Sequence, residues 1–472
     1  MVFSSMVFIF IFLPVTCLVY YLCPSRTVRN VILTLASLFF YAWGEPAYII
    51  LMLVSILMNW AFSLILAKLR SRGAEGSKYL KPILTLSVLA NLGFLFVFKY
   101  LDFFLGAANT LLKAELPLSG LVLPIGISFY TFQALSYVID VYRGESDALK
   151  NPLHVALFIS LFPQLIAGPI VRYSDIKTEI TGRRESAEDF FAGLEQFMFG
   201  LGAKVLLANN LAVVADGVFS SKGDAGTAAV FIAAVAYMLQ IFFDFSGYST
   251  MATGLGRMFG FHFPRNFNAP YTATSITDFW RRWHMTLSVW FRDYVYIPLG
   301  GNRCSTARHI RNIMVTWLLT GFWHGAGWNF ILWGVYYGLL LLVEKYAVLP
   351  ALKKLPERAG RIIGKAYTLI LVLFGWLIFR VDDAQALSVV LKASDGLPLS
   401  QFVLVHADMM SKTVFILPAI LFSTRFPSWL NEKLSSRHSL ETVRALLACL
   451  VFIASIFMLE ASTYNPFIYF RF

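Results

Sequence analysis

The sequence predicts an all-α, polytopic integral membrane protein, and two observations predict it: the composition and the long apolar runs. Hydrophobic residues make up 58% of the 472 residues and charged residues only 14%, whereas a soluble domain carries about 25% charged residues. A soluble core of this size cannot hide so much apolar surface, because surface area falls too slowly with size. About 20 apolar residues are needed to cross a bilayer. We expect roughly ten to twelve membrane-embedded segments, with clear runs at 6–22, 47–67, 82–104 and 228–243 and shorter or broken runs at 122–141 and 443–459.

The formal net charge of +12 fits the positive-inside bias of membrane proteins better than a nucleic-acid role. Basic residues cluster after the first segment, at 68–81 and at 353–365. Placing these clusters in the cytoplasm puts the N-terminus and a tail at 461–472 outside. The first segment has no positive flank and no small-residue cleavage site, so we expect a membrane helix there. The four cysteines form no CxxC or Cys/His cluster, which argues against a disulfide framework and predicts no metal site.

We expect a single membrane domain over 1–472, because no linker, low-complexity tract or repeat interrupts the chain. The region 254–311 is too polar to span a membrane and too aromatic for an ordinary loop. Within it, the periodicity predicts one helix over 278–294 with Thr277 as its N-cap. Its aromatic residues share a stripe, so we expect the helix to lie in the membrane interface with its arginines toward the cytoplasm.

His324 is the first candidate for chemistry. It lies in the apolar run 313–343, which three glycines interrupt and which we therefore expect to be broken or tightly packed at its middle. An ionisable side chain in such a run marks a functional site by default, and an imidazole suits a general base that takes a proton from an attacking hydroxyl. The alternative is a packing histidine that bonds to a neighbouring helix.

His284 is the second candidate, and the segment around Asp244 is a third feature of interest. Ser288 and Arg292 follow His284 at i+4 and i+8 on one helix face, and Asp278 is expected to pair with the residue one turn later, Arg282. The alternative for His284 is an interfacial histidine with its hydrogen bonds satisfied. For Asp244 we favour a structural polar network at a helix kink. No phosphate-binding glycine loop, nucleophile elbow or metal-ligand spacing is present, so nucleotide hydrolysis is not expected.

Three motifs then resemble a known family. They are FDFSGYSTMATGLGRMFGFHFPRNFNAPY, SITDFWRRWHMTLSVWFRDYVYIPLGGNR and LTGFWHGAGWNFILWG. Together they resemble the membrane-bound O-acyltransferase family, in the bacterial branch of alginate O-acetyltransferase membrane subunits. The opening MVFSSMVFIFIFLPV, the AGPIVRYSDI stretch and the terminal FIYFRF are similar to that branch too, so the resemblance covers nearly the whole chain.

The resemblance implies a ring of transmembrane and re-entrant helices around a central funnel, with a catalytic core at about 228–345. It implies that His324 is the family's catalytic histidine and that His284 is its second motif histidine. Acetyl-CoA is the implied acyl donor, with no bound cofactor. A cationic vestibule would attract this anionic donor, and its candidate residues are Arg281, Arg282, Arg292 and Arg303. The positive-inside bias explains these arginines equally well. The candidates for stabilising the oxyanion are Asn329 and Trp328. The candidate substrate-binding residues are Arg281, Arg282, Trp283, Ser288, Arg292 and Asn329.

The resemblance implies a multi-pass protein of the bacterial inner membrane that acetylates an extracytoplasmic polysaccharide of the alginate type or another exopolysaccharide. Peptidoglycan O-acetylation and teichoic-acid D-alanylation remain alternatives. A transporter is the alternative of another class, because broken helices also mark substrate pathways. Since the external loops look short, we expect an extracytoplasmic partner protein that carries the acetyl group to the polymer. In the tail, we expect Tyr469 to act as an acyl relay, because a phenol is nucleophilic once a base takes its proton. The alternative for Tyr469 is an aromatic anchor at the membrane interface.

Overall fold

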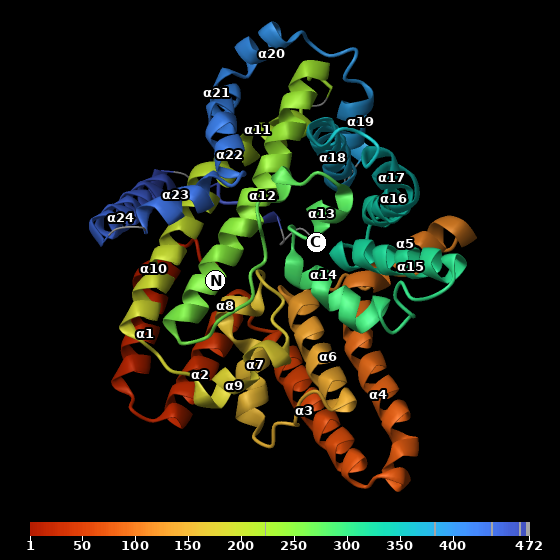
Figure 1. Cartoon of the computed structure of the whole chain (residues 1–472), viewed down its shortest axis with the longest axis vertical. Helices are drawn as coiled ribbons and strands as arrows, with labels where there is room; N and C mark the ends of the chain where they lie inside the picture. Colours follow the sequence, from red (N-terminus) through yellow and green to blue (C-terminus); the bar gives the residue numbers. More distant parts are fainter. Residues whose placement is uncertain (222, 382–383, 436–437, 462–463, 469–472) are drawn as a thin grey trace. The chain divides into compact units, whose positions relative to one another are not determined.

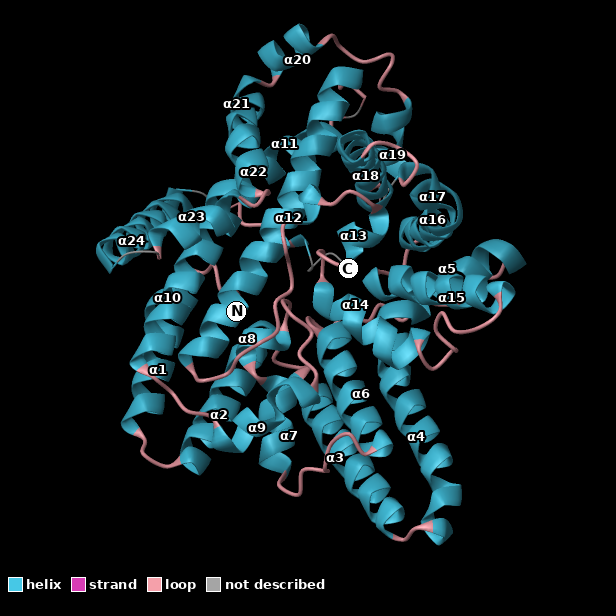
Figure 2. Cartoon of the chain, in the orientation of Figure 1, coloured by secondary structure: helices cyan, strands magenta, loops and turns pink. Residues whose placement is uncertain are grey.

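The computed structural model describes residues 1–221, 223–381, 384–435, 438–461 and 464–468, and their regular structure is helical (Figures 1 and 2). The prediction of an all-α polytopic membrane protein is confirmed. The chain groups into two compact units. Unit 1 comprises Met1–Phe197 and Met251–Pro264, and unit 2 comprises Met198–Thr250 and Arg265–Phe472. The expectation of a single domain stays a prediction.

Unit 1 is built from the first ten helices. They are α1 (Leu13–Leu22), α2 (Arg26–Gly44), α3 (Ile49–Ser71), α4 (Ala74–Leu95), α5 (Leu101–Leu112), α6 (Ile127–Arg143), α7 (Pro152–Ser160), α8 (Phe162–Leu165), α9 (Tyr173–Gly182) and α10 (Ala187–Gly202). The π-helical segments Phe8–Phe12 and Phe96–Tyr100 precede α1 and α5. The last residues of α10 belong to unit 2, and the last residues of α12 belong to unit 1.

Unit 2 contains the remaining helices. They are α11 (Asn209–Phe219), α12 (Thr227–Met258), α13 (Ile276–Trp280), α14 (Met285–Phe291), α15 (Thr306–His324), α16 (Trp328–Val343), α17 (Leu349–Leu352), α18 (Glu357–Arg380), α19 (Ala384–Leu391), α20 (Leu399–Val405), α21 (Ala407–Ser411), α22 (Ile416–Phe422), α23 (Phe426–Leu434) and α24 (His438–Ala461). The π-helical segment η3 (Ala203–Ala208) joins α10 to α11. Further π-helical segments lie at Arg292–Tyr296 and Glu344–Val348, and short 3₁₀ turns at Pro270–Thr272 and Lys412–Phe415.

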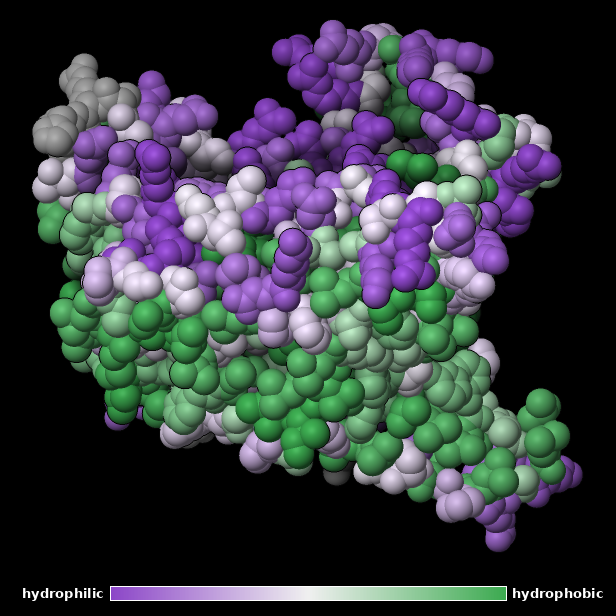
Figure 3. Space-filling model, turned by 90° about the horizontal axis from the view of Figure 1, so that it is seen from below, coloured by the Kyte–Doolittle hydropathy of each residue, from purple (hydrophilic) through white to green (hydrophobic). Residues whose placement is uncertain are grey.

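Seven helices of the described chain are long and apolar enough to cross a membrane, or eight if one bent pair is a single span. The prediction of ten to twelve membrane-embedded segments counted shorter and broken segments as well, which this number leaves out. The spans that matter for the site are Thr227–Met258, which is α12, and Trp328–Leu352, which begins with α16. On the face seen in Figure 3, hydrophobic residues gather in a broad area and hydrophilic residues gather along one side of it.

Helix α3 shows how unit 1 distributes its side chains for a lipid environment. The apolar Ile50 and Leu57 are 67% and 55% exposed, whereas the polar Ser55 and Asn59 are buried. Asn59 and Asn91 of α4 exchange two amide hydrogen bonds, of 3.0 and 2.9 Å. Lipid offers no polar partners, so these amides bind each other inside the protein and join the two helices.

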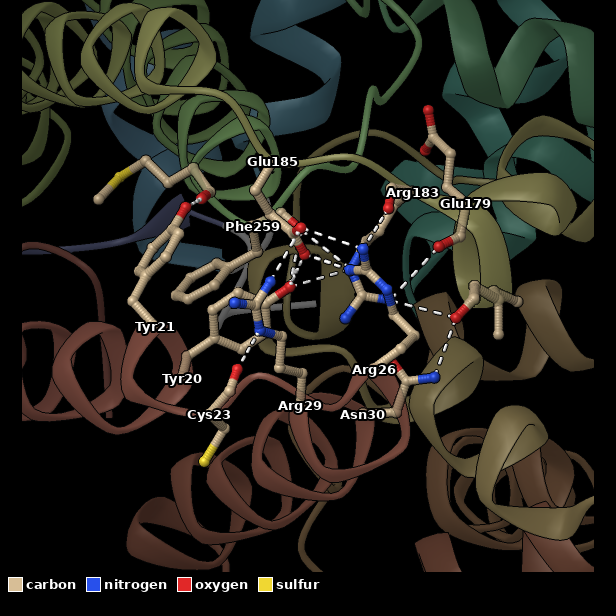
Figure 4. A network of polar contacts seen from close by, with 12 residues as sticks. Tyr20, Tyr21, Cys23, Arg26, Arg29, Asn30, Glu179, Arg183, Glu185 and Phe259 are labelled. Atoms are coloured by element: carbon tan, nitrogen blue, oxygen red, sulfur yellow. Dashed lines mark hydrogen bonds and ion pairs between the residues drawn. The ribbon is translucent and has the colours of Figure 1, made fainter.

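A charged network ties the start of unit 1 to its later segments (Figure 4). Arg26 and Arg29 of α2 both donate to the carboxylate of Glu185, Arg29 at 3.0 Å. Arg183 lies 3.6 Å from the same carboxylate, and Tyr20 of α1 donates to it. Arg26 and Arg29, which the positive-inside rule places in the cytoplasm, therefore also bind the connecting segment between α9 and α10.

We predict that Asn59→Leu destabilises the protein by about 1–2 kcal/mol, because it leaves the buried amide of Asn91 without its partner. The double variant Asn59→Leu/Asn91→Leu should cost clearly less than the sum of the two single changes. Unfolding free energies in mixed micelles measure this, with Leu57→Val on the exposed face as the control. Strict additivity of the two single variants would contradict the role given to this pair.

Candidate active site

His324 is the last residue of α15, at a break in the apolar run 313–343. Gly325 and Gly327 are extended, with φ of −174° and −151°, and α16 starts at Trp328. The predicted break in this run is confirmed. The chain thus forms a helical hairpin, and His324 lies at its turn.

Two glycines bring α15 and α16 into backbone contact just before this turn. A Cβ atom on Gly321 would lie 2.3 Å from the carbonyl oxygen of Phe330, and one on Gly334 would lie 2.5 Å from that of Trp317. Both distances are far shorter than a van der Waals contact, so no other residue fits without separating the helices. This contact fixes the place of the His324 backbone.

The imidazole of His324 is buried among aromatic rings. Its centroid lies 5.1 Å from the ring of Trp333 on α16 and 5.2 Å from that of Phe379 on α18, both edge to face, and 4.9 Å from Trp323. Asn329 donates an amide hydrogen bond of 3.0 Å to the carbonyl of Phe379, which ties the end of α18 to the turn. His324 is therefore enclosed in a rigid, water-poor environment.

His284 also lies at a turn, and here the expected helix over 278–294 is wrong. Helix α13 ends at Trp280, α14 starts at Met285, and His284 between them has the left-handed φ of 42°. Ser275, not Thr277, caps α13 by accepting the backbone N–H of Asp278 at 3.0 Å. A non-glycine residue at positive φ is uncommon and is held by its surroundings, often at a functional site.

Asn266 holds this turn. Its side-chain oxygen accepts hydrogen bonds from His284 Nδ1 at 3.1 Å and from the hydroxyl of Thr286 at 2.9 Å, and its NH2 group donates to Ser249 of α12 at 3.0 Å. Its backbone carbonyl accepts from the N–H of Met285 at 2.9 Å. Because an amide oxygen only accepts, Nδ1 of His284 carries the ring proton and Nε2 carries a lone pair.

The two histidines belong to one buried region of unit 2. Trp323 contacts both rings, with centroids 6.0 Å from His284 and 4.9 Å from His324, and Phe245 of α12 packs edge-on against His284 at 4.6 Å. Burial, and repulsion from His324 whenever that imidazole is protonated, lower the pKa of His284 well below 6.5. His284 is therefore neutral at physiological pH, and no described residue hydrogen-bonds its buried Nε2.

The other predicted site residues are packed in the core, paired with a carboxylate, or exposed. Trp283 is buried in the aromatic core with Trp376 at 4.7 Å, and Arg282 forms the expected pair with Asp278 at 2.8 Å. Arg281 is exposed, and Arg292 pairs with its neighbour Asp293 at 2.7 Å. The hydroxyl of Ser288 donates to the carbonyl of Trp280 at 3.2 Å, and the expectation that His284, Ser288 and Arg292 share a face stays a prediction.

The aromatic stripe of this segment is buried. Its members lie inside unit 2: Trp280, Trp283, Leu287, Trp290 and Phe291. The expectation that the segment lies in the membrane interface stays a prediction. The most exposed side chains of the segment include those of Arg281 and Arg292.

Sequence reasoning missed two residues that the structure brings to this region. Asn266 was overlooked inside an aromatic stretch, and Lys204 was overlooked inside an apolar one. Lys204 forms an ion pair with Asp244 at 2.6 Å, with both side chains 3% exposed. The polar network expected at Asp244 is confirmed, although α12 continues through this position. A lone lysine in the run GLGAKVLLA was the available signal.

Tyr469 lies outside the described residues. In the described part of the chain, no cluster of three or more His, Cys, Asp or Glu side chains is arranged to hold a metal ion.

Comparisons with known proteins agree on one family. Residues 35–381, which include both histidines, match the membrane-bound O-acyltransferase family. The chain is 38% identical, over all of both sequences, to a protein of Pseudomonas putida named probable alginate O-acetylase AlgI. It is 33% identical to the peptidoglycan O-acetyltransferase of Helicobacter pylori, over 100% of this chain and 98% of that protein. A teichoic acid D-alanyltransferase of Bacillus subtilis is 31% identical over 56% of this chain and 70% of that protein's sequence.

We predict that the unfolding free energy of the wild-type protein falls as pH drops below about 6.5, because the unfolded chain then binds a proton that folded His284 does not. The slope from this group approaches about 1.4 kcal/mol per pH unit. His284→Asn should flatten the curve by that amount, since Asn tolerates positive φ and keeps a donor toward Asn266. Unfolding in micelles between pH 7.5 and 5.5 measures the slopes, with His262→Asn as control. Equal slopes for wild type and His284→Asn would contradict this burial argument.

Proposed function

Because this chain belongs to the membrane-bound O-acyltransferase family and is an O-acyltransferase of a bacterial membrane, we propose that it takes an acetyl group from cytoplasmic acetyl-CoA and passes it across the membrane for the O-acetylation of an extracytoplasmic polysaccharide. The family membership decides against the transporter alternative. Peptidoglycan acetylation and D-alanylation stay open as related outcomes, since relatives with those names share this chain's sequence.

The observation that carries the proposal is the pair of buried imidazoles in one water-poor region of unit 2. In the proposed step, a hydroxyl oxygen attacks the thioester carbonyl while His324 takes the hydroxyl proton. The carbon–sulfur bond then breaks, and the thiolate leaves with the proton that His324 releases. A thioester is already activated, so positioning of the two reactants supplies much of the rate.

His284 has a different part in this proposal. It is neutral, its Nδ1–H is held by Asn266, and its Nε2 lone pair faces the buried region. These features suit a residue that accepts a hydrogen bond from a substrate and orients it. Asn329 keeps one amide N–H beyond the bond to Phe379, so it remains the candidate donor to the oxyanion.

We further propose that Tyr469 relays the acetyl group and that an extracytoplasmic partner protein carries it to the polymer. The phenol oxygen attacks the thioester carbon while its proton passes to a base. The carbon–sulfur bond then breaks, CoA leaves with the proton from the base, and the resulting aryl ester is reactive enough to transfer onward. The support is the sequence of the tail and its resemblance to the family. The name of the Pseudomonas putida relative, probable alginate O-acetylase, supports a polysaccharide acceptor.

We predict that His324→Gln lowers acetyl transfer from labelled acetyl-CoA by about 10²- to 10⁴-fold, because it removes the general base. The measurement uses membrane vesicles with matched amounts of folded protein. His309→Gln is the matched control, since His309 is also buried in unit 2 but bonds Lys345 and Tyr346 at 3.0 and 3.1 Å. More than about a tenth of wild-type activity in His324→Gln would remove the base assignment.

We predict that Tyr469→Phe abolishes acetylation of the polymer, because it deletes the hydroxyl and keeps the apolar ring. Cells that carry the variant should make unacetylated polymer, and the release of CoA from acetyl-CoA by their membranes should fall as well. An unchanged content of acetyl esters would leave Tyr469 as an aromatic anchor.

Addition of the extracytoplasmic fraction to purified protein tests the partner, since full polymer acetylation without that fraction would exclude the need for a partner protein.

A further inference from the structure

The last described residues of the chain, 464–468, are held inside unit 2. Chain ends are usually poorly ordered unless specific contacts tie them down. Here Phe467 and Ile468 are 7% and 4% exposed, and Ile468 belongs to the same hydrophobic core as Trp283 and Trp333. The end of the chain therefore has a binding site within its own unit.

The centre of this binding site is the buried ion pair of Lys204 and Asp244. The second carboxylate oxygen of Asp244 accepts the backbone N–H of Ile468 at 2.7 Å. The ammonium group of Lys204 lies 2.6 Å from the other carboxylate oxygen of Asp244, and it donates to the side-chain oxygen of Asn209 at 2.8 Å and to the backbone carbonyl of Pro466. One hydrogen bond of the ammonium group thus binds the chain end.

Charge burial explains why these contacts matter. A buried ion pair repays the loss of hydration only when further hydrogen bonds satisfy its remaining donors and acceptors. The chain end supplies one such bond to each partner. Because both bonds go to backbone groups, they fix the path of the segment and do not depend on the side chains of Pro466 and Ile468.

Side chains on both sides of the ion pair make the binding specific. Asn209 donates to the side-chain oxygen of Asn465 at 3.1 Å. The ring of Phe467 lies 4.7 Å from that of Tyr248 and 5.9 Å from the ammonium of Lys204. Farther out, Tyr464 donates to Asp216, which is paired with Arg380 at 3.0 Å. Four of the five residues of the segment thus have a polar or aromatic partner of their own, and Pro466 contributes its carbonyl.

Local backbone features bring the two charges together. Lys204 lies in the π-helical segment η3, a type of distortion that often occurs at functional sites. A Cβ atom on Gly247 would lie 2.8 Å from the carbonyl oxygen of Gly200, so glycine alone permits this approach of α12 to the chain before η3. Both features shorten the distance between Lys204 and Asp244.

One stretch of α12 contacts both the chain end and the turn of His284. Asp244 and Tyr248 contact the segment 464–468. Phe245 packs on His284, and Ser249 accepts from Asn266, which in turn holds His284. The position of the chain end and that of the histidine are therefore set by adjacent residues of one helix.

We propose that Lys204 and Asp244 form a docking site for the chain's own segment 464–468 and act as positioning residues that hold the chain end beside the histidine region. The consequence for transfer rests on the proposed function, in which the next residue, Tyr469, receives the acetyl group. The docking itself does not depend on that role.

Hydrogen exchange of the C-terminal peptide in the full-length protein tests the docking directly. The double variant Lys204→Met/Asp244→Asn removes both charges at nearly constant volume, a change that often leaves stability unaffected. We expect its C-terminal amides to exchange at least about tenfold faster than those of wild type. Glu344→Gln is the matched control, because Glu344 is also buried and accepts from the backbone N–H of Thr277 at 2.9 Å, and it should leave this exchange unchanged. Unchanged protection in the folded double variant would overturn the proposal.

A variant on the segment itself covers the case in which the double variant does not fold. Ile468→Pro deletes the N–H that Asp244 accepts and leaves the ion pair intact, whereas Ile468→Val keeps the N–H. We expect the C-terminal amides to exchange faster than those of wild type in Ile468→Pro and at the wild-type rate in Ile468→Val.

Transfer assays on the same proteins test the positioning role. Acetylation of the polymer and CoA release from acetyl-CoA should both fall at least about tenfold in the double variant and in Ile468→Pro, while Ile468→Val retains both. A freed chain end with unchanged polymer acetylation would overturn the positioning role. If Tyr469→Phe alone proves silent, the relay fails, and the exchange data still decide the docking.

Discussion

The buried carboxylate of Asp244 is the constraint on which much of unit 2 depends. A charge in this apolar setting has to be neutralised within the protein, and the structure does so with Lys204 and with the backbone of the chain end. These partners come from positions 204 and 468, far apart in sequence. The need to satisfy one carboxylate therefore brings η3, α12 and the last described residues into one arrangement.

The two histidines occupy similar backbone settings and differ in their chemical surroundings. Each lies at an interruption between two helices, where a side chain can reach a buried space without disturbing a helical hydrogen-bond ladder. His284 has a polar neighbour that fixes its tautomer, whereas His324 is enclosed by aromatic rings. This difference agrees with an orienting role for the first and a proton-accepting role for the second.

The sequence predicted those features that depend on composition or on local spacing. The all-α membrane class followed from the apolar runs, and the break near His324 from its flanking glycines. The Asp278–Arg282 pair followed from helical spacing. The turn at His284 could not be predicted, because no glycine or proline marks it and a long-range bond from Asn266 stabilises it. The partner of Asp244 and the path of residues 464–468 were missed for the same reason, since both depend on contacts between distant segments.

The glycine contact between α15 and α16 has a consequence for how the protein is made. Helix α15 has 19 residues, but with Arg308 and Arg311 near its start it is not among the helices apolar enough to cross a membrane. Its partner α16 begins one of those spans. Since Gly321 and Gly334 let the two backbones touch, α15 gains its stable place only after α16 has left the ribosome. His324 at the turn is therefore positioned late in biogenesis, when both arms of the hairpin have been made.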